Sequence, residues 1–406
     1  MPERPYINLL DPEFYVDPWE AYRWMRAHEP VFWDDTQRIW GITRFEDVMY
    51  VEKHPQTYTS VPGSRPRIDQ SDDPSMINAD DPVHQHHRAL IHRRFTPRAV
   101  VTQEDEVREV VSGIIDAVAP LGRCDAVEAI ASRLPAIMIG RRLGYAPDDW
   151  EKVRFWSEAT MFVGGQTSPV DGLMRHDHPL LAESMTDFAA TTVAIINDRR
   201  ANPREDLISA WVQAERYGEG RPWTDAEILA ECILVLDGGA ETTRTVIGAI
   251  IRELALRPDQ RQILLDRPEV LARTAVEEFI RWVSPILNMR RTVTEDHELH
   301  GRELHAGDEV LLLYPSANRD EAEFVDPDAF DVTRDMQQQL SFGIGTHFCL
   351  GASFARLEVR VMFEELLRRI PDWRLADDPE PRIIPSTFAR GYDQVPIEFT
   401  PAPAAT

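Results

Sequence analysis

The sequence predicts a mainly α-helical protein with a minor β-sheet region, folded as one large domain. Three observations indicate this class. Apolar residues recur at helical spacing through most of the 406 residues, one stretch alternates like a β-hairpin, and no repeat or linker divides the chain. With 43% hydrophobic residues, a chain of this length can bury a large core. We therefore expect a single domain over residues 1–406, with tail-like ends at 1–10 and 400–406.

The elements follow in order along the chain. The first predicted helix lies in "DPWEAYRWMRAHEP", with Asp17 as its cap and Pro18 at its first position. The following stretch, "PVFWDDTQRIWGITRF", predicts a hairpin with a polar turn near Asp35. The segments 60–76 and 164–179 are predicted to be long loops, which in a compact fold are often binding loops. Further helices are predicted at 84–94, 104–118, 125–143, 148–163, 180–200 and 204–217.

Composition limits the classes of partner. Lys and Arg total 44 against 69 Asp and Glu, a net charge of -25, which argues against general binding to nucleic acid or an anionic membrane but leaves room for a local basic patch. The three cysteines are far apart, so no disulfide framework is expected. The N-terminus has no apolar run typical of a signal peptide or membrane anchor. We expect a soluble cytoplasmic protein.

One cysteine stands in a chemically suggestive place, in "FGIGTHFCLGASFARLEVR", residues 342–360. Glycines flank Cys349 on both sides, and a helical pattern follows it directly. Free N–H groups at a helix N-terminus favour the thiolate, which acts as a nucleophile or a metal ligand. A zinc site would need more ligands at suitable spacing, and a nucleophile would need a base that the sequence does not place. From these residues alone, a buried structural cysteine also remains open.

The residues around Cys349 carry a family resemblance. Phe342, Gly345, His347, Cys349 and Gly351 form the pattern F-x-x-G-x-H-x-C-x-G, which resembles the haem-binding signature of the cytochrome P450 family. The resemblance implies the P450 fold and a haem b cofactor, with Cys349 as the axial thiolate on the iron. It also implies that Phe342 shields the sulfur and that amides near Gly351 tune it.

A second motif lies in "ECILVLDGGAETTRTVIGAI", residues 231–250. Gly238 and Gly239 interrupt a buried helical pattern, at a cost of about 1 kcal/mol each relative to alanine, and such pairs tend to bend helices. Considered without the cysteine signature, this glycine pair indicates a place where another helix packs closely. Beside the cysteine signature, it is similar to the family's oxygen-binding motif, which implies that Thr242 hydrogen-bonds dioxygen and Glu241 relays protons from solvent. Gly238 replaces the more usual alanine, which would widen the cavity.

Two further sets of residues match family positions. Glu278 and Arg281 in "AVEEFIRW" resemble the structural E-x-x-R motif, whose usual third partner would be Arg334. Anionic haem propionates need cations or strong donors. The residues at the family positions for this role are His84, Arg88, Arg291 and His347.

The resemblance implies a haem-thiolate monooxygenase that inserts one oxygen atom into a C–H bond and receives electrons from a ferredoxin and its reductase. Two other classes stay open, a peroxygenase that uses hydrogen peroxide directly and a haem-binding sensor or carrier without turnover. A basic docking face for the donor is expected near Cys349. Its predicted arginines are Arg93, Arg94, Arg98, Arg356 and Arg360.

The predicted substrate is large and apolar, because the segments at the family's pocket positions are rich in apolar residues and offer few charges. The stretches "LDGGAETTR" and "SPILNMRRTVTED" look most like actinobacterial cytochromes that hydroxylate the end of sterol side chains. A fatty acid, a terpene or a macrolide remains an alternative. The predicted pocket residues are Leu234, Gly238, Ile286, Leu287, Met289 and Phe388.

Overall fold

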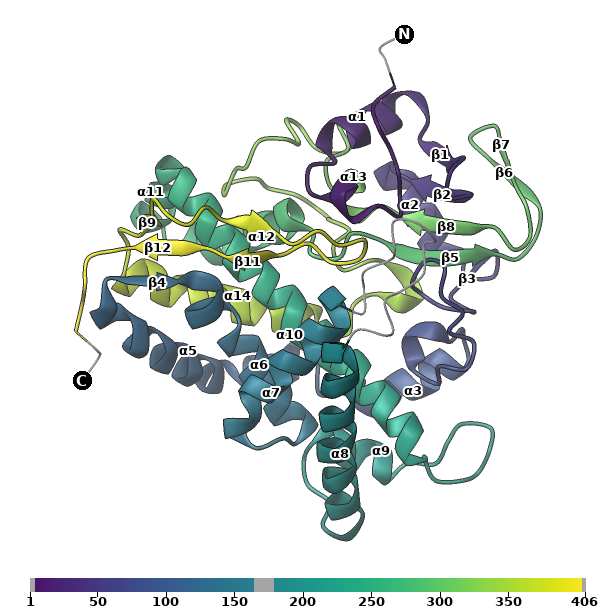
Figure 1. The fold of residues 1–406 in the computed structure, drawn as a ribbon, viewed down its shortest axis with the longest axis horizontal. Helices are drawn as coiled ribbons and strands as arrows, with labels where there is room; N and C mark the ends of the chain where they lie inside the picture. Colours follow the sequence, from purple (N-terminus) through teal and green to yellow (C-terminus); the bar gives the residue numbers. More distant parts are fainter. Residues whose placement is uncertain (1–3, 164–178, 404–406) are drawn as a thin grey trace.

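A computed structural model describes residues 4–163 and 179–403, and helices form most of this structure (Figure 1). The mainly α-helical class with a minor sheet region is therefore confirmed. The predicted loop at 164–179 lies almost wholly outside the described residues. The helices are α1 (Trp19–His28), α2 (Phe45–Lys53), α3 (Val83–His92), α4 (Pro97–Val101), α5 (Glu104–Val118), α6 (Arg133–Leu143), α7 (Trp150–Glu158), α8 (Pro179–Ala201), α9 (Leu207–Val212), α10 (Asp225–Leu256), α11 (Pro258–Asp266), α12 (Val276–Val283), α13 (Tyr314–Ala317) and α14 (Ala352–Arg369).

The strands form four small sheets. The largest has the order β1-β2-β8-β5-β3, with β2 and β8 parallel and its other neighbours antiparallel. It joins the predicted hairpin, β1 (Val31–Asp34) and β2 (Ile39–Ile42), to strands far along the chain. The remaining strands are β3 (Tyr58–Thr59), β4 (Arg123–Asp125), β5 (Met289–Val293), β6 (His297–Leu299), β7 (Arg302–Leu304), β8 (Glu309–Leu312), β9 (Arg374–Leu375), β10 (Arg382–Ile383), β11 (Tyr392–Gln394) and β12 (Pro396–Glu398).

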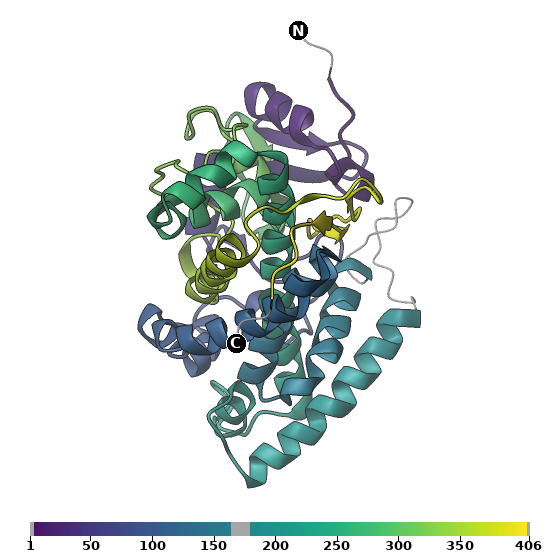
Figure 2. The same ribbon diagram turned by 90° about the vertical axis from the view of Figure 1, so that its left-hand side faces the viewer.

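Helix α10 runs through the centre of the molecule (Figures 1 and 2). Its 32 residues begin with a capping box, in which Thr224 accepts the Glu227 N–H and the Glu227 carboxylate accepts the Thr224 N–H. It packs against α6, α7, α12 and α14. The helix continues through Gly238 and Gly239 without a break in its assignment. The glycine pair therefore does not end the helix, and neighbouring helices support this segment on several sides.

Several predicted bounds are corrected by the structure. Helix α1 begins at Trp19, with Pro18 at the cap and no side-chain hydrogen bond there. The helix predicted at 125–143 is divided, because β4 pairs with β12 and a π-helical turn at Val127–Ala131 precedes α6. The stretch 204–217 keeps only the short α9, which Asp206 caps by accepting the Ser209 N–H.

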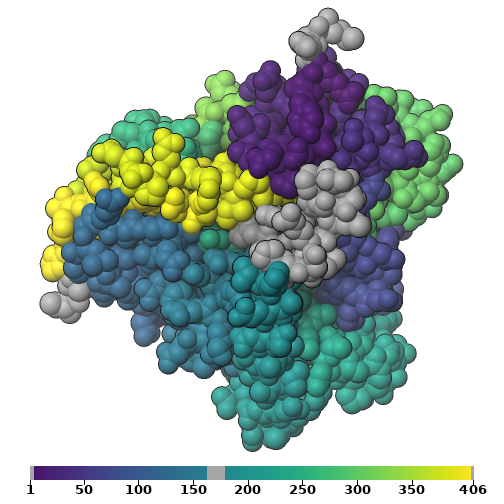
Figure 3. All heavy atoms as spheres, viewed as in Figure 1, coloured from purple at the N-terminus to yellow at the C-terminus, as the bar shows by residue number. Residues whose placement is uncertain are grey.

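The two chain ends are less tail-like than expected. Leu9 and Leu10 are buried in a cluster with Phe14 and Tyr15, and the Leu9 N–H donates to the Asp34 carboxylate at 2.8 Å. Figure 3 shows the C-terminal segment, in yellow, lying between the N-terminal residues in purple and the α5 region in blue. No helix in residues 4–163 or 179–403 has the length and apolar character needed to cross a lipid bilayer.

Candidate active site

The loop before α14 fixes the position of Cys349. The Cys349 N–H donates to the Phe342 carbonyl at 2.8 Å, which closes the loop on itself. Gly345 has a φ of +74°, and a Cβ there would lie 2.7 Å from the Glu52 carbonyl oxygen. Only glycine fits this close approach. Gly351 stands at the cap of α14, so Cys349 precedes the helix N-terminus as predicted.

Cys349 lines an internal cavity of about 490 Å³. The loop residues Phe342 and His347 line the same cavity, and α10 contributes Gly238 and Thr242 from another wall. The structure therefore brings together the cysteine signature and the glycine-containing motif, which are about 100 residues apart in the sequence. Of the predicted pocket residues, those that line the cavity are Leu234, Gly238, Ile286, Met289 and Phe388.

Leu287 is the exception among the predicted pocket residues. Its side chain is 1% exposed and packs with Leu9, Leu311 and Leu313 in the core beneath the five-stranded sheet. Ile286 and Leu287 are neighbours in an extended segment, where successive side chains point to opposite faces. Ile286 takes the cavity side, and Leu287 is a core residue.

Five side chains that can carry positive charge also line this cavity, namely Arg65 and the four predicted residues His84, Arg88, Arg291 and His347. The two imidazole rings lie 4.2 Å apart between centroids. Burial, with the nearby Arg291, His84 and Arg88, lowers the pKa of His347 far below its usual range, so this ring is neutral. Within the described residues, Arg88 has no carboxylate partner and donates instead to the Phe348 carbonyl at 2.7 Å. Guanidinium and imidazole donors converging on one cavity fit an anionic ligand.

The surroundings of Cys349 act on the pKa of its thiol in opposite directions. Burial raises the pKa of this thiol, while the N–H of Gly351, the charges of Arg88 and Arg356, and the N–H of Ala352 lower it. The net direction is upward, so the helix N-terminus alone does not produce the thiolate that the sequence argument favoured. A buried sulfur in this position needs a cation to hold it ionised. Haem iron would provide that cation, so the donor set and its surroundings fit the cofactor.

Thr242 and Glu241 lie on different sides of α10. The Thr242 hydroxyl donates to the Gly238 carbonyl at 2.8 Å and its side chain lines the cavity. The Glu241 carboxylate is 1% exposed and accepts from Ser157 at 2.7 Å and Arg244 at 2.6 Å. Glu241 is not among the cavity residues. The predicted relay would therefore require the Glu241 carboxylate to leave Arg244 and turn toward the cavity.

The predicted structural pair is fully buried. The Arg281 guanidinium lies 2.7 Å from the Glu278 carboxylate, and both side chains are 0% exposed. Arg334 lies 3.2 Å from the same carboxylate, as expected for the third partner. Arg281 also donates to the carbonyls of Asn318 and Pro327, which ties α12 to the segment leading toward the cysteine loop.

Five charged residues of the cavity were not predicted as site residues, namely Glu52, Arg65, Asp73, Asp237 and Glu358. Glu52 accepts the Ile344 N–H at 2.6 Å and the Tyr314 hydroxyl at 2.6 Å, and it lies 3.8 Å from Arg291. No local pattern marked it, because its partners are distant in sequence. Asp237 and Arg65 face each other in the cavity wall. Asp237 did carry a signal, since it is a carboxylate within the apolar stretch "ILVLDGG".

The arginines predicted for electron-donor docking separate into two groups. Arg356 pairs with Glu277 at 3.0 Å, and Arg360 pairs with Glu104 at 2.6 Å, so both are already neutralised. Arg93 and Arg98, at the end of α3 and in α4, are exposed, and Arg94 beside Arg93 is half-buried. Arg93 and Arg98 therefore attract an external acidic partner more strongly than Arg356 and Arg360 do.

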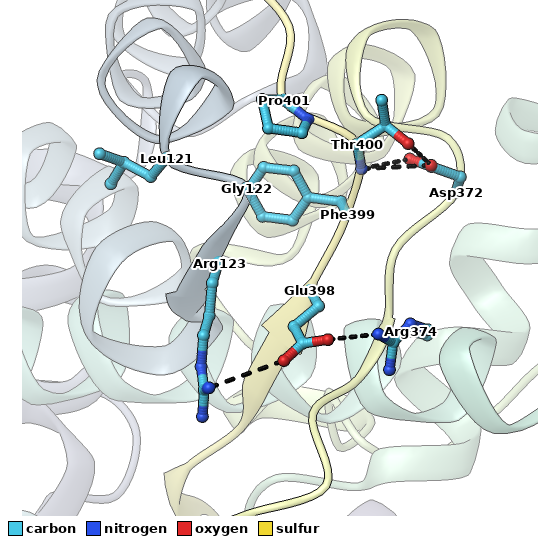
Figure 4. A pocket seen from close by; sticks show the side chains of 9 residues that line it. All are labelled: Leu121, Gly122, Arg123, Asp372, Arg374, Glu398, Phe399, Thr400 and Pro401. Atoms are coloured by element: carbon cyan, nitrogen blue, oxygen red, sulfur yellow. Dashed lines mark hydrogen bonds and ion pairs between the residues drawn. The ribbon is translucent and has the colours of Figure 1, made fainter.

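A second recess, of about 530 Å³, lies on the surface beside β12 (Figure 4). Arg123 and Arg374 flank Glu398 there, and Asp372 accepts from the Thr400 hydroxyl at 2.5 Å. The residues that line it are separate from those of the Cys349 cavity. Its charges already pair with one another, and we assign it no chemical role.

The geometry above fits a haem-binding site, and comparisons with known proteins identify the family. The family model "Cytochrome P450" matches residues 270–391. The chain is 40% identical to the steroid C26-monooxygenase of Mycolicibacterium smegmatis, over 98% of this chain and 97% of that protein. It is 36% identical to the methyl-branched lipid omega-hydroxylase of Mycobacterium tuberculosis, over 89% of this chain and 84% of that protein.

The same likeness extends to solved structures. The structure of CYP109E1 from Bacillus megaterium in complex with testosterone superposes with a TM-score of 0.84, at 31% identity, over 95% of this chain and 99% of that one. The chain belongs to the cytochrome P450 family. It is a monooxygenase that binds haem b and acts on apolar substrates.

Proposed function

We propose that this P450 hydroxylates the end of an apolar lipid chain, and that a steroid side chain is its first candidate substrate. The observation that carries the proposal is the wall of the cavity beside α10. Leu234, Ile286 and Met289 supply apolar surface there, and Gly238 leaves open space where a Cβ would stand. Such a site accepts a slender apolar chain end. The steroid C26-monooxygenase named above is similar over nearly the whole chain.

Different residues around the cavity would hold different parts of the cofactor. Cys349 would provide the thiolate ligand to iron, and His84, Arg88, Arg291 and His347 would hold the propionates. Phe342 lines the cavity beside Cys349 and would limit water near the sulfur. When bound, haem supplies the activation of dioxygen. Glu278, Arg281 and Arg334 would keep the supporting helices in place.

Thr242, like its neighbour Thr243, is a hydroxyl residue that α10 presents to the cavity. Its O–H donates to the Gly238 carbonyl, so rotation about one side-chain bond would turn that proton toward the reaction site. Glu241 would replenish the proton after parting from Arg244, which holds it in the described conformation. An alcohol that controls protons is needed by an oxygenase and is of little use to a peroxygenase or a haem carrier.

We further propose that a ferredoxin and its reductase supply the electrons, on the face that carries the cysteine loop. Arg93 and Arg98 are exposed cations on this part of an otherwise strongly acidic chain. The cytoplasm is the proposed compartment, because the three cysteines, Cys124, Cys232 and Cys349, are all free.

The test uses the purified ferric holoenzyme. Cholest-4-en-3-one, a methyl-branched fatty acid and a macrolactone are titrated separately, and displacement of water from iron is followed as a shift of the haem absorption band. Turnover with a ferredoxin system and mass spectrometry then locate the new oxygen. A tight shift with the steroid and oxygen on its terminal carbon are expected. No shift with the steroid beside a tight shift with either rival overturns the steroid proposal.

The methyl-branched lipid is the second candidate, because a relative named for that substrate is 36% identical over 89% of this chain. Both candidates present a branched apolar chain end to the same cavity. The ratio of product formed to reductant consumed separates a monooxygenase reaction from reductant-independent peroxide use and from binding without turnover.

A further inference from the structure

The wall of the Cys349 cavity contains a charged pair that an entirely apolar substrate would leave unused. Arg65 comes from the segment between β3 and α3, and Asp237 comes from α10. Both line the cavity, with side chains only 15% and 13% exposed. The closest guanidinium nitrogen and carboxylate oxygen are 3.9 Å apart, which exceeds hydrogen-bonding distance.

The partners of this pair are incomplete among the described residues. One Asp237 oxygen accepts the Thr160 hydroxyl at 2.5 Å, while the other faces Arg65 across the 3.9 Å gap. The Arg65 guanidinium reaches the Thr160 carbonyl at 3.5 Å and the Met161 sulfur at 3.8 Å, and it lies 4.2 Å from the Phe388 ring centroid. These contacts are long for a guanidinium. A buried charged group in this condition is costly until a further group completes its hydrogen bonds.

The 3.9 Å distance between the Arg65 guanidinium and the Asp237 carboxylate, and the chemistry of these two groups, indicate which ligand group would bridge them. One oxygen atom fits between a donor and an acceptor 3.9 Å apart, at about 2.8–2.9 Å from each. A hydroxyl can accept from Arg65 and donate to Asp237 at the same time. A carbonyl would serve Arg65 alone, and a carboxylate would face the Asp237 carboxylate. We propose that Arg65 and Asp237 form a hydroxyl-binding anchor for an alcohol group on an otherwise apolar substrate.

The anchor lies close to the part of α10 that carries Thr242. Asp237 precedes Thr242 by five residues, which corresponds to about 7.5 Å along the helix axis. The hydroxyl and the carbon to be oxidised therefore belong to the same region of the substrate. This inference rests on the proposed function and narrows it, since it selects alcohols among apolar lipids.

The test compares matched alcohols and hydrocarbons on the ferric holoenzyme. The probes are dodecan-1-ol with dodecane, and citronellol with 2,6-dimethyloct-2-ene, each titrated by the shift of the haem absorption band. Dodecanoic acid is included as the anionic probe. In at least one pair, the alcohol is expected to bind about tenfold to a hundredfold more tightly than its hydrocarbon, the range for a hydrogen bond to a charged group.

Variants assign that preference to the pair. Arg65→Met and Asp237→Leu are each expected to abolish the preference for the alcohol while leaving hydrocarbon affinity within about threefold of the parent, a margin near 0.6 kcal/mol. Arg67→Met is the matched control, because Arg67 lies in the same segment, contacts Glu309 and the Arg38 carbonyl, and does not line the cavity. It is expected to keep the full preference. Equal haem content in all variants verifies folding.

Three outcomes overturn the anchor. They are the absence of an alcohol preference in both pairs, an equal loss of alcohol and hydrocarbon affinity in Arg65→Met, and tightest binding of dodecanoic acid with no effect of Asp237→Leu. None of them bears on the steroid proposal. That proposal depends on cholest-4-en-3-one and on the position of its new oxygen, so the two can fail separately.

Discussion

Cys349 is a residue at which burial and local charge act in opposite directions. Burial raises the pKa of its thiol, and the Gly351 N–H and Arg88 only partly compensate. The sulfur therefore depends on a bound metal cation to remain a thiolate. The surrounding loop fixes the position of this sulfur through glycines at positive φ and a hydrogen bond from the Cys349 N–H to the Phe342 carbonyl.

Replacement of Cys349 by Ala or Ser is expected to remove the thiolate ligand without filling or enlarging the loop. The ferrous–carbon monoxide complex of the variant should lose the strongly red-shifted absorption band, because that band requires a thiolate opposite the carbon monoxide. The parent protein measured in parallel is the control. Survival of the band in either variant would show that another residue holds the iron.

Thr242→Ala is expected to uncouple turnover, so that reductant is still consumed while peroxide replaces product. The hydroxyl that lines the cavity is lost, whereas the helix keeps its packing because only the Gly238 contact is removed. Thr243→Ser, on the next residue of α10, serves as a conservative control. The measurement is the ratio of product and peroxide to reductant consumed.

Glu241→Gln should act differently. It weakens a buried ion pair with Arg244, so a loss of stability is expected together with slower proton delivery. If both Thr242→Ala and Glu241→Gln keep parental coupling, the proposed alcohol and acid roles are wrong.

Asp237 predicts a dependence of alcohol binding on pH. The pKa of Asp237 is raised to about 7, chiefly by burial and to a smaller extent by Glu241, against the lowering effects of Arg65 and Thr160. The carboxylate is the stronger acceptor, so the preference for dodecan-1-ol over dodecane should rise between pH 6 and pH 8. The increase should approach about tenfold, the ratio of ionised fractions across a pKa near 7. Asp237→Asn should remove the trend, and a pH-independent preference in the parent would contradict it.

At the scale of elements, helices set by local sequence patterns were predicted correctly, whereas elements that depend on contacts distant in sequence were not. Helix α5 begins at Glu104 and ends at Val118 as predicted, because local apolar periodicity sets it. The stretch 125–143 was wrong as one α-helix, since Asp125 belongs to β4, which pairs with β12 about 270 residues later, and a π-helical turn at Val127–Ala131 precedes α6. Helix α10 continues through its glycine pair, where α6 and α7 pack against it.

Gly238 and Gly239 are expected to respond in opposite ways to alanine. A Cβ at Gly238 meets no atom of residues 4–163 or 179–403 within 4 Å, so Gly238→Ala should stabilise the helix by about 0.5–1 kcal/mol while narrowing the cavity. A Cβ at Gly239 would lie 2.6 Å from the Ile139 side chain on α6, so Gly239→Ala should cost about 1–3 kcal/mol.

Denaturant midpoints of the two holoprotein variants test this contrast between neighbouring residues. Ligand titration should also show that Gly238→Ala, despite its greater stability, weakens the binding of bulky substrates. Equal destabilisation by both alanines would mean that α10 needs glycine at both positions for backbone reasons.

At the scale of the whole molecule, the sequence predicted which residues meet but not how they are oriented. Cys349, Arg291, His84 and Thr242 line one cavity, as motif matching implied. Glu241 points away from it and Leu287 belongs to the core, because a motif fixes position along the chain and not the direction of each side chain. The pairing of Arg65 with Asp237 was not predicted, since the two residues meet only after α10 and a distant loop have packed.

The chain has a net charge of -25, so the places where basic residues remain exposed and unpaired determine where an acidic partner is attracted. Arg356 and Arg360 are held in ion pairs, so the exposed Arg93 and Arg98 should dominate attraction to an acidic ferredoxin. Reversing both to Glu is expected to lower the electron-transfer rate several-fold at low ionic strength and to weaken its salt dependence.

The matched control for this reversal changes the same number of charges elsewhere. Arg123 and Arg374 flank Glu398 in the surface recess of Figure 4, and Arg374 lies on β9, which Figure 1 places on the opposite side of the molecule from α3. Reversing both to Glu alters net charge equally but should change the rate much less, because the added charges lie farther from the docking face. Stopped-flow reduction across a salt series measures both. Equal effects of the two reversals would show that total charge governs the encounter, and a salt-independent parent rate would exclude electrostatic steering altogether.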